Sequence, residues 1–161
     1  MASKVPTTRS IAWISLVPQL CVMVVLIGAL HLLDAPQPSL FGMVAYLLLS
    51  ITLRLSLTAH HRKGIQDVKA GLFEKAIPWF EKSVAYFERR PWLDRYRYLL
   101  LLSSSAWSYR EMGMANRAFC LSQMGRRTEA IAAYEAVLKE FPESTLAIVA
   151  LRMLAANDTP T

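Results

Sequence analysis

The chain has 161 residues, of which 54% are hydrophobic and 19% are charged, and its formal net charge is +6. This length leaves room for one modest soluble domain together with membrane segments. The mean hydropathy of +0.30 excludes an ordinary soluble domain, and the apolar excess lies in the first third of the chain. Acidic residues are interspersed among the basic ones, so we do not expect a nucleic-acid-binding protein.

The first apolar stretch follows a short polar segment, residues 1–10, that carries Lys4 and Arg9. Residues 11–33 contain no Lys, Arg, Asp or Glu, and a stretch of this length can cross a hydrocarbon layer of ~30 Å. A cleaved signal peptide is the alternative interpretation. We favour a retained transmembrane helix because the stretch is long for a signal core and a second apolar stretch follows closely.

That second stretch, residues 40–57, is interrupted by a single charge, Arg54. The intervening Asp34, Pro36 and Pro38 predict a short turn, so the two helices should form an antiparallel transmembrane hairpin. Basic residues lie at the two outer ends of this hairpin and not in its turn. The positive-inside rule then predicts a multi-pass protein of a bacterial-type inner membrane with both termini in the cytoplasm.

Residues 58–156 change to amphipathic patterns and predict an all-α domain, followed by a flexible tail at 157–161. We expect helices over 60–70, 72–89 and 143–156, with a long inserted helix that begins at Pro91. The sequence leaves open whether residues 92–124 form one helix or two helices broken near Gly113. The apolar run Leu99–Leu102 should be buried on more than one side.

The clearest pattern in the domain is residues 125–142, which read GRRTEAIAAYEAVLKEFP. Gly125 suits a tight reversal between two helices, where a positive φ favours glycine. Ala130 permits close helix approach, and Tyr134, four residues later on the same face, fills the space between helices. Pro142 ends the second helix because proline cannot extend a helix interior.

The same spacing occurs twice along the chain. The two series, in matching order, are Gly64, Gly71, Ala76, Phe80 and Ala118, Gly125, Ala130, Tyr134. Their equivalent glycines are 54 positions apart (125 − 71), about 20 more than a repeat of about 34 residues. The pattern resembles the tetratricopeptide repeat (TPR) family. The expected fold class is therefore all-α, with an N-terminal two-helix transmembrane hairpin followed by TPR-like helical hairpins and a long inserted helix.

The TPR resemblance implies a concave groove that binds peptides or protein segments and is lined by the first helix of each repeat. Mapped by spacing, the candidate groove residues are His61, Ile65, Val68, Ala115, Asn116, Phe119 and Ser122. An apolar or helical ligand suits these side chains better than a terminal carboxylate. The alternative is that the inserted helix fills the groove from within the same chain.

The expected function is a membrane-anchored adaptor or assembly factor whose partners are another protein or membrane complex and the lipid bilayer. The alternative is a structural subunit that associates with itself through Leu99–Leu102. We expect no enzyme, because the chain has no phosphate-binding glycine loop and no nucleophile elbow. Accordingly, no catalytic, cofactor-binding or metal-binding residue is predicted.

Overall fold

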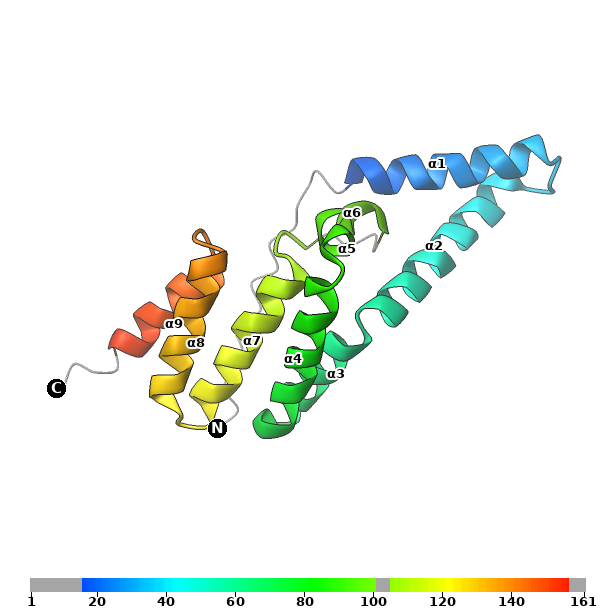
Figure 1. Ribbon diagram of the computed structural model, residues 1–161. Helices are drawn as coiled ribbons and strands as arrows, with labels where there is room; N and C mark the ends of the chain where they lie inside the picture. Colours follow the sequence, from blue (N-terminus) through cyan, green and yellow to red (C-terminus); the bar gives the residue numbers. More distant parts are fainter. Residues whose placement is uncertain (1–15, 101–104, 157–161) are drawn as a thin grey trace. The chain divides into compact units, whose positions relative to one another are not determined.

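The computed structural model describes residues 16–100 and 105–156, and the regular elements of this part are α-helices (Figure 1). These residues separate into two compact units, one up to Leu55 with residues 96–107, and the other with residues 56–95 and 108 onward. Several predicted features lie outside the described residues. These are the N-terminal segment 1–10, the start of the first apolar stretch, Leu101 and Leu102, and the tail 157–161.

The first unit contains α1 (Leu16–Leu32), most of α2 (Pro38–Leu57) and the short α6 (Arg97–Leu100), which packs against α1. The turn between α1 and α2 is short, as predicted, and has positive φ angles of 49° at Asp34 and 50° at Gln37. Among the described residues, α2 alone is long and apolar enough to cross a membrane, whereas α1 has 17 residues. The predicted pair of membrane spans is therefore not confirmed.

The second unit consists of two helical hairpins and a terminal helix. Its helices are α3 (Ala59–Lys69), α4 (Phe73–Glu88), α5 (Pro91–Arg95), α7 (Tyr109–Gln123), α8 (Arg127–Glu140) and α9 (Thr145–Ala156). In Figure 1, α4 lies beside α7, and α7 lies beside α8. Each helix therefore packs on its neighbours in the stack, with α9 against the last hairpin.

Both hairpins turn in the same way. Gly71 and Gly125 have φ angles of 73° and 74°, a conformation that favours glycine. The amide of Leu72 donates to the Asp67 carbonyl at 2.8 Å, and the amide of Arg126 donates to the Leu121 carbonyl at 3.0 Å. With the amides of both glycines bonded to the carbonyls three residues earlier, each helix ends in a Schellman motif. Gly71 and Gly125 therefore have the same conformation and the same hydrogen-bond pattern.

The alanine and aromatic residues of the repeat signature lie in the interior of the second unit, whereas Gly71, Gly125 and Pro142 are exposed. Ala76, Phe80, Ala118 and Ala130 have no exposed surface, and Tyr134 is 4% exposed. A Cβ placed on Gly64 would lie 2.7 Å from the Phe80 ring, so this glycine allows α3 to approach α4 closely. Pro142 lies two residues after Glu140, the last residue of α8, and follows the C-cap residue Phe141.

The prediction of a long inserted helix is wrong. Within residues 91–100 the chain forms only α5 and α6, and the next helix, α7, begins at Tyr109 after Ser108 in an extended conformation. Gly113 lies inside α7 and does not break it. A Cβ at Gly113 would lie 2.8 Å from a Val84 methyl group, so this glycine serves close packing of α7 on α4.

Candidate interaction surfaces

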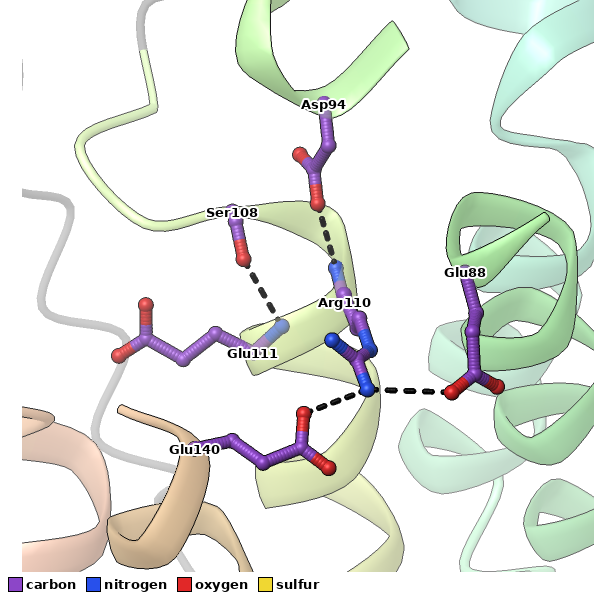
Figure 2. A network of polar contacts seen from close by, with 6 residues as sticks. All are labelled: Glu88, Asp94, Ser108, Arg110, Glu111 and Glu140. Carbon is purple, nitrogen blue, oxygen red and sulfur yellow. Dashed lines mark hydrogen bonds and ion pairs between the residues drawn. The ribbon is translucent and has the colours of Figure 1, made fainter. Parts of the chain in front are cut away.

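A polar network fixes the beginning of α7 (Figure 2). One Asp94 carboxylate oxygen accepts from the Tyr109 amide at 2.8 Å, and the other accepts from the Arg110 amide at 3.0 Å. The Ser108 hydroxyl accepts from the Glu111 amide at 3.0 Å. These bonds satisfy three of the four amides that a helix leaves unpaired at its N-terminus. Asp94, buried at the end of α5, therefore determines where the chain re-enters the helical stack.

Arg110 extends this network across the second unit. Its Nη2 atom lies 3.1 Å from a Glu88 carboxylate oxygen on α4 and 2.5 Å from a Glu140 oxygen on α8 (Figure 2). All three side chains are partly exposed, so these pairs contribute little free energy in water. Their main effect is geometric, because one guanidinium group on α7 joins the ends of two helices from different hairpins.

The seven predicted groove residues lie on α3 and α7, and we call the surface formed by the partly exposed ones the α3–α7 face. Ala115 packs in the cluster of Tyr134 and Val137, whereas Val68 packs in another cluster. His61, Val68 and Ala115 are buried. The partly exposed members are Ile65, Asn116, Phe119 and Ser122. A ligand on this face would meet these four side chains.

His61 belongs to the interior. Its ring makes edge contacts with Phe80 and Tyr109, each with ring centroids 5.6 Å apart. Within the described part of the chain its Nδ1 atom has no hydrogen-bond partner. Burial lowers the pKa of His61 from 6.5 to about 4, so the ring is neutral at neutral pH and acts as a core side chain.

Val68 and Phe119, two of the predicted groove residues, make apolar contacts. Val68 packs in one cluster with Phe80 and Cys120, and the Phe119 ring meets the Phe73 ring edge-on at 6.2 Å. Burial raises the pKa of the Cys120 thiol to about 11 and, as the main cause, that of the neighbouring Tyr134 hydroxyl to about 12. Both groups are therefore uncharged at neutral pH.

A concave surface, which the sequence did not predict, lies between α4 and α8 over α7. This α4–α8 groove has a volume of about 260 Å³ and is lined by Glu81, Val84, Ala85, Glu88, Met114, Arg117, Ala133 and Ala136. Arg117 Nε donates to a Glu81 carboxylate oxygen at 2.9 Å across it. Met114 and Arg117 lie on a different side of α7 from Phe119 and Ser122, since successive helical residues are about 100° apart. The lining includes the small residues Ala85, Ala133 and Ala136. Small residues are visible in the sequence, but helix packing requires them equally.

The side-chain composition of the α3–α7 face and of the α4–α8 groove is suited to contact with another protein segment. Among residues 16–100 and 105–156, no group of three His, Cys, Asp or Glu side chains is arranged to hold a metal ion. Both surfaces combine apolar side chains with a few polar groups, an arrangement suited to another protein segment.

Comparison with known proteins supports a TPR-like assignment. The tetratricopeptide repeat family model matches residues 104–144, which contain α7 and α8. No curated protein and no solved structure matches the chain. TPR domains are typically non-enzymatic folds that bind other proteins. The match is limited to the second hairpin, so the assignment of the first hairpin rests on its equivalent turn and packing.

Proposed function

We propose that this protein is a membrane-anchored interaction module, an adaptor or assembly factor, that presents its TPR-like domain at the cytoplasmic face of a bacterial-type inner membrane. The observation that carries the proposal is the pair of equivalent helical hairpins, of which the second matches the TPR family. A TPR-like stack builds a continuous surface from neighbouring hairpins, and such a surface is suited to binding a protein segment.

The composition of α2 supports anchorage in a membrane. This helix has 20 residues, and only Gly42 and Ser50 among them are buried. Its exposed apolar side chains need an apolar environment, and its length matches a hydrocarbon layer of ~30 Å. Together with the apolar α1 and the short turn, α2 would form the predicted transmembrane hairpin.

The α3–α7 face is the proposed binding site. Ile65 and Phe119 would supply apolar contacts to a helical or extended segment of the partner, and Asn116 and Ser122 would supply hydrogen-bonding groups. Phe119 is held by its edge contact with Phe73, so little side-chain freedom would be lost on binding.

The test is quantitative mass spectrometry of proteins that co-purify with the intact chain from native membranes in mild detergent. Asn116→Arg would place a large charge on the proposed site, whereas Ala132→Arg places the same charge at an exposed position on α8. We expect one stoichiometric partner that Asn116→Arg loses and Ala132→Arg retains. Equal recovery of that partner with both variants would exclude the α3–α7 face as its site.

The same experiment addresses the alternative function. Recovery of the protein alone, at a multiple of its own mass, would favour the structural subunit that associates with itself. The exposed Val149 and Met153 side chains of α9 would then be candidates for the contact between copies, besides Leu99–Leu102.

A further inference from the structure

The outer side of the first hairpin carries cationic and aromatic side chains close together. We call this set the basic–aromatic surface, and its members are His60, Lys63, Trp79, Lys82, Tyr86 and Arg90. The two helices α3 and α4 contribute to it jointly. It shares no residue with the α3–α7 face or with the lining of the α4–α8 groove.

The contacts within this surface are cation–π contacts. The Nζ atoms of Lys63 and Lys82 lie 4.5 Å and 4.6 Å from the centroid of the Trp79 ring. The Arg90 guanidinium lies 4.6 Å from the centroid of the Tyr86 ring. All three distances are within the ~6 Å over which such attraction is significant. Two ammonium groups thus share one indole ring, although their charges repel each other.

The positive charge of the surface is not compensated by ion pairs. Glu81 of α4 pairs with Arg117, and Glu88 pairs with Arg110, both on α7. In the described part of the chain, no carboxylate lies within ion-pair distance of Lys63, Lys82 or Arg90. The acids of α4 therefore face the next hairpin, and its cations remain available to an anionic partner.

The aromatic side chains are only partly covered. Trp79 and Tyr86 are half-buried, whereas Phe80 and Phe87 on the inner side of α4 are buried. α4 thus has aromatic residues on two sides, and those on the outer side contact mainly cations. Aromatic rings with a polar edge, flanked by Lys and Arg, are the composition favoured at membrane interfaces.

The chain also brings this surface near the end of the candidate membrane span. α2 ends at Leu57 and α3 begins at Ala59, so Thr58 alone separates the two helices. His60 is three residues beyond Leu57 (60 − 57), which corresponds to about 5 Å along a helix. A surface attached so directly to a span cannot move far from the lipid headgroups.

We propose that the basic–aromatic surface binds the headgroups of anionic lipids. The ammonium and guanidinium groups would pair with lipid phosphates, and the Trp79 and Tyr86 rings would lie at the headgroup level. This inference rests on the membrane anchorage proposed above. It adds a preference for lipid charge, which a hydrophobic anchor by itself does not have.

The experiment measures how fast an amine-reactive acetylating reagent modifies individual lysines of the intact protein in lipid nanodiscs. Discs of phosphatidylcholine alone are compared with discs that also contain phosphatidylglycerol, and mass spectrometry reads each site. We expect severalfold slower modification of Lys63 and Lys82 in the anionic discs, with the rate restored by high salt. Lys139, exposed on α8, is the internal reference and should change little.

Two variants with equal charge change provide the matched control. Lys63→Glu/Lys82→Glu should reduce severalfold the phosphatidylglycerol that co-purifies with the protein. Lys139→Glu/Arg152→Glu should leave it unchanged. Equal modification of Lys63 and Lys82 in both kinds of disc would overturn the proposal. So would slow modification in both kinds, which would mean that protein covers the surface.

The proposed anchor can fail independently of this inference. If the chain does not enter discs of either composition, the membrane span is rejected. Salt-sensitive flotation of the intact protein with phosphatidylglycerol vesicles, but not with phosphatidylcholine vesicles, would still support the basic–aromatic surface. Absence of that flotation would reject it.

Discussion

The two helical hairpins have the same backbone plan but different interiors. His61 and Ser83 in the first hairpin correspond to Ala115 and Val137 in the second, each pair 54 positions apart (115 − 61 and 137 − 83). All four residues are buried. The first hairpin therefore encloses an imidazole and a hydroxyl group where the second encloses only apolar side chains.

This difference shows which part of a repeat is determined by sterics and which part can vary. The turn glycines and the small residues where helices approach are retained in both hairpins. The polar atoms His61 Nδ1 and Ser83 Oγ are buried, and within the described residues neither has a hydrogen-bond partner. Such atoms cost free energy, so we expect the first hairpin to open more readily than the second.

The largest expected effect is acid sensitivity that originates at His61. The folded protein binds a proton there only below a pKa of about 4, whereas the unfolded chain does so below about 6.5. The free energy of unfolding therefore does not depend on His61 protonation above pH 6.5. It falls as the pH drops from 6.5 toward 4 and no longer changes through this group below pH 4. The loss should amount to about 3 kcal/mol.

The measurement is the urea midpoint of the intact protein in detergent between pH 4 and pH 7. His61→Met should remove most of this dependence, since a thioether does not titrate. An equally steep pH profile in His61→Met would assign the acid sensitivity to other groups.

The next effect concerns the residue that allows close helix approach in each hairpin. Gly64→Ala adds a Cβ 2.7 Å from the Phe80 ring and should destabilise the protein by about 1–3 kcal/mol. The second hairpin already has Ala118 at this position, so Ala118→Gly should cost only about 1 kcal/mol. Denaturant unfolding of both variants compares the two sites. The steric explanation would be contradicted if Gly64→Ala lowered the free energy of unfolding less than Ala118→Gly does.

The two hairpins also differ, with a smaller expected effect on stability, in how the N-terminus of their first helix is capped. Asp94→Ala leaves the amides of Tyr109 and Arg110 without their carboxylate acceptor and should cost about 0.5–2 kcal/mol. By contrast, α3 of the first hairpin begins without a side-chain capping bond. Amide hydrogen exchange resolved along the chain is the measurement. Faster exchange confined to the first turn of α7 is expected in Asp94→Ala.

The smallest effect is a stabilisation. Ser83→Ala removes a buried hydroxyl group that has no partner in the described structure, and it should raise the free energy of unfolding by about 1 kcal/mol. Val137→Thr introduces a hydroxyl group at the equivalent position and should lower it by at least as much. Destabilisation by Ser83→Ala would indicate that the hydroxyl group is satisfied.

Sequence reasoning identified the hairpins because their signals are local. The signals are a glycine at a reversal, a small residue five positions later and an aromatic residue four positions after that. All three depend on sterics within one helix pair. The groove prediction was less informative, since burial of His61 and Val68 depends on neighbours from other helices. The predicted membrane hairpin, the binding face and the localisation stay predictions.

The insertion was misjudged for a different reason. The sequence predicted a long helix that begins at Pro91, and it left open whether this helix is broken near Gly113. The bonds from Asp94 to the amides of Tyr109 and Arg110 connect residues 15 and 16 positions apart, and no local pattern reveals them. The sequence did not predict the α4–α8 groove for the same reason, because the two sides of this groove come from different hairpins.

Asp94 and Arg110 also have a consequence for how the chain can change over evolution. The Asp94 carboxylate at the end of α5 accepts from the Arg110 amide, and the Arg110 guanidinium group pairs with Glu88, so residues on both sides of the segment 96–107 contact one another in the stack. Spacing between the hairpins in the stack is thus decoupled from the number of residues between them. We therefore expect the hairpins to keep their packing when the length of the segment between them changes.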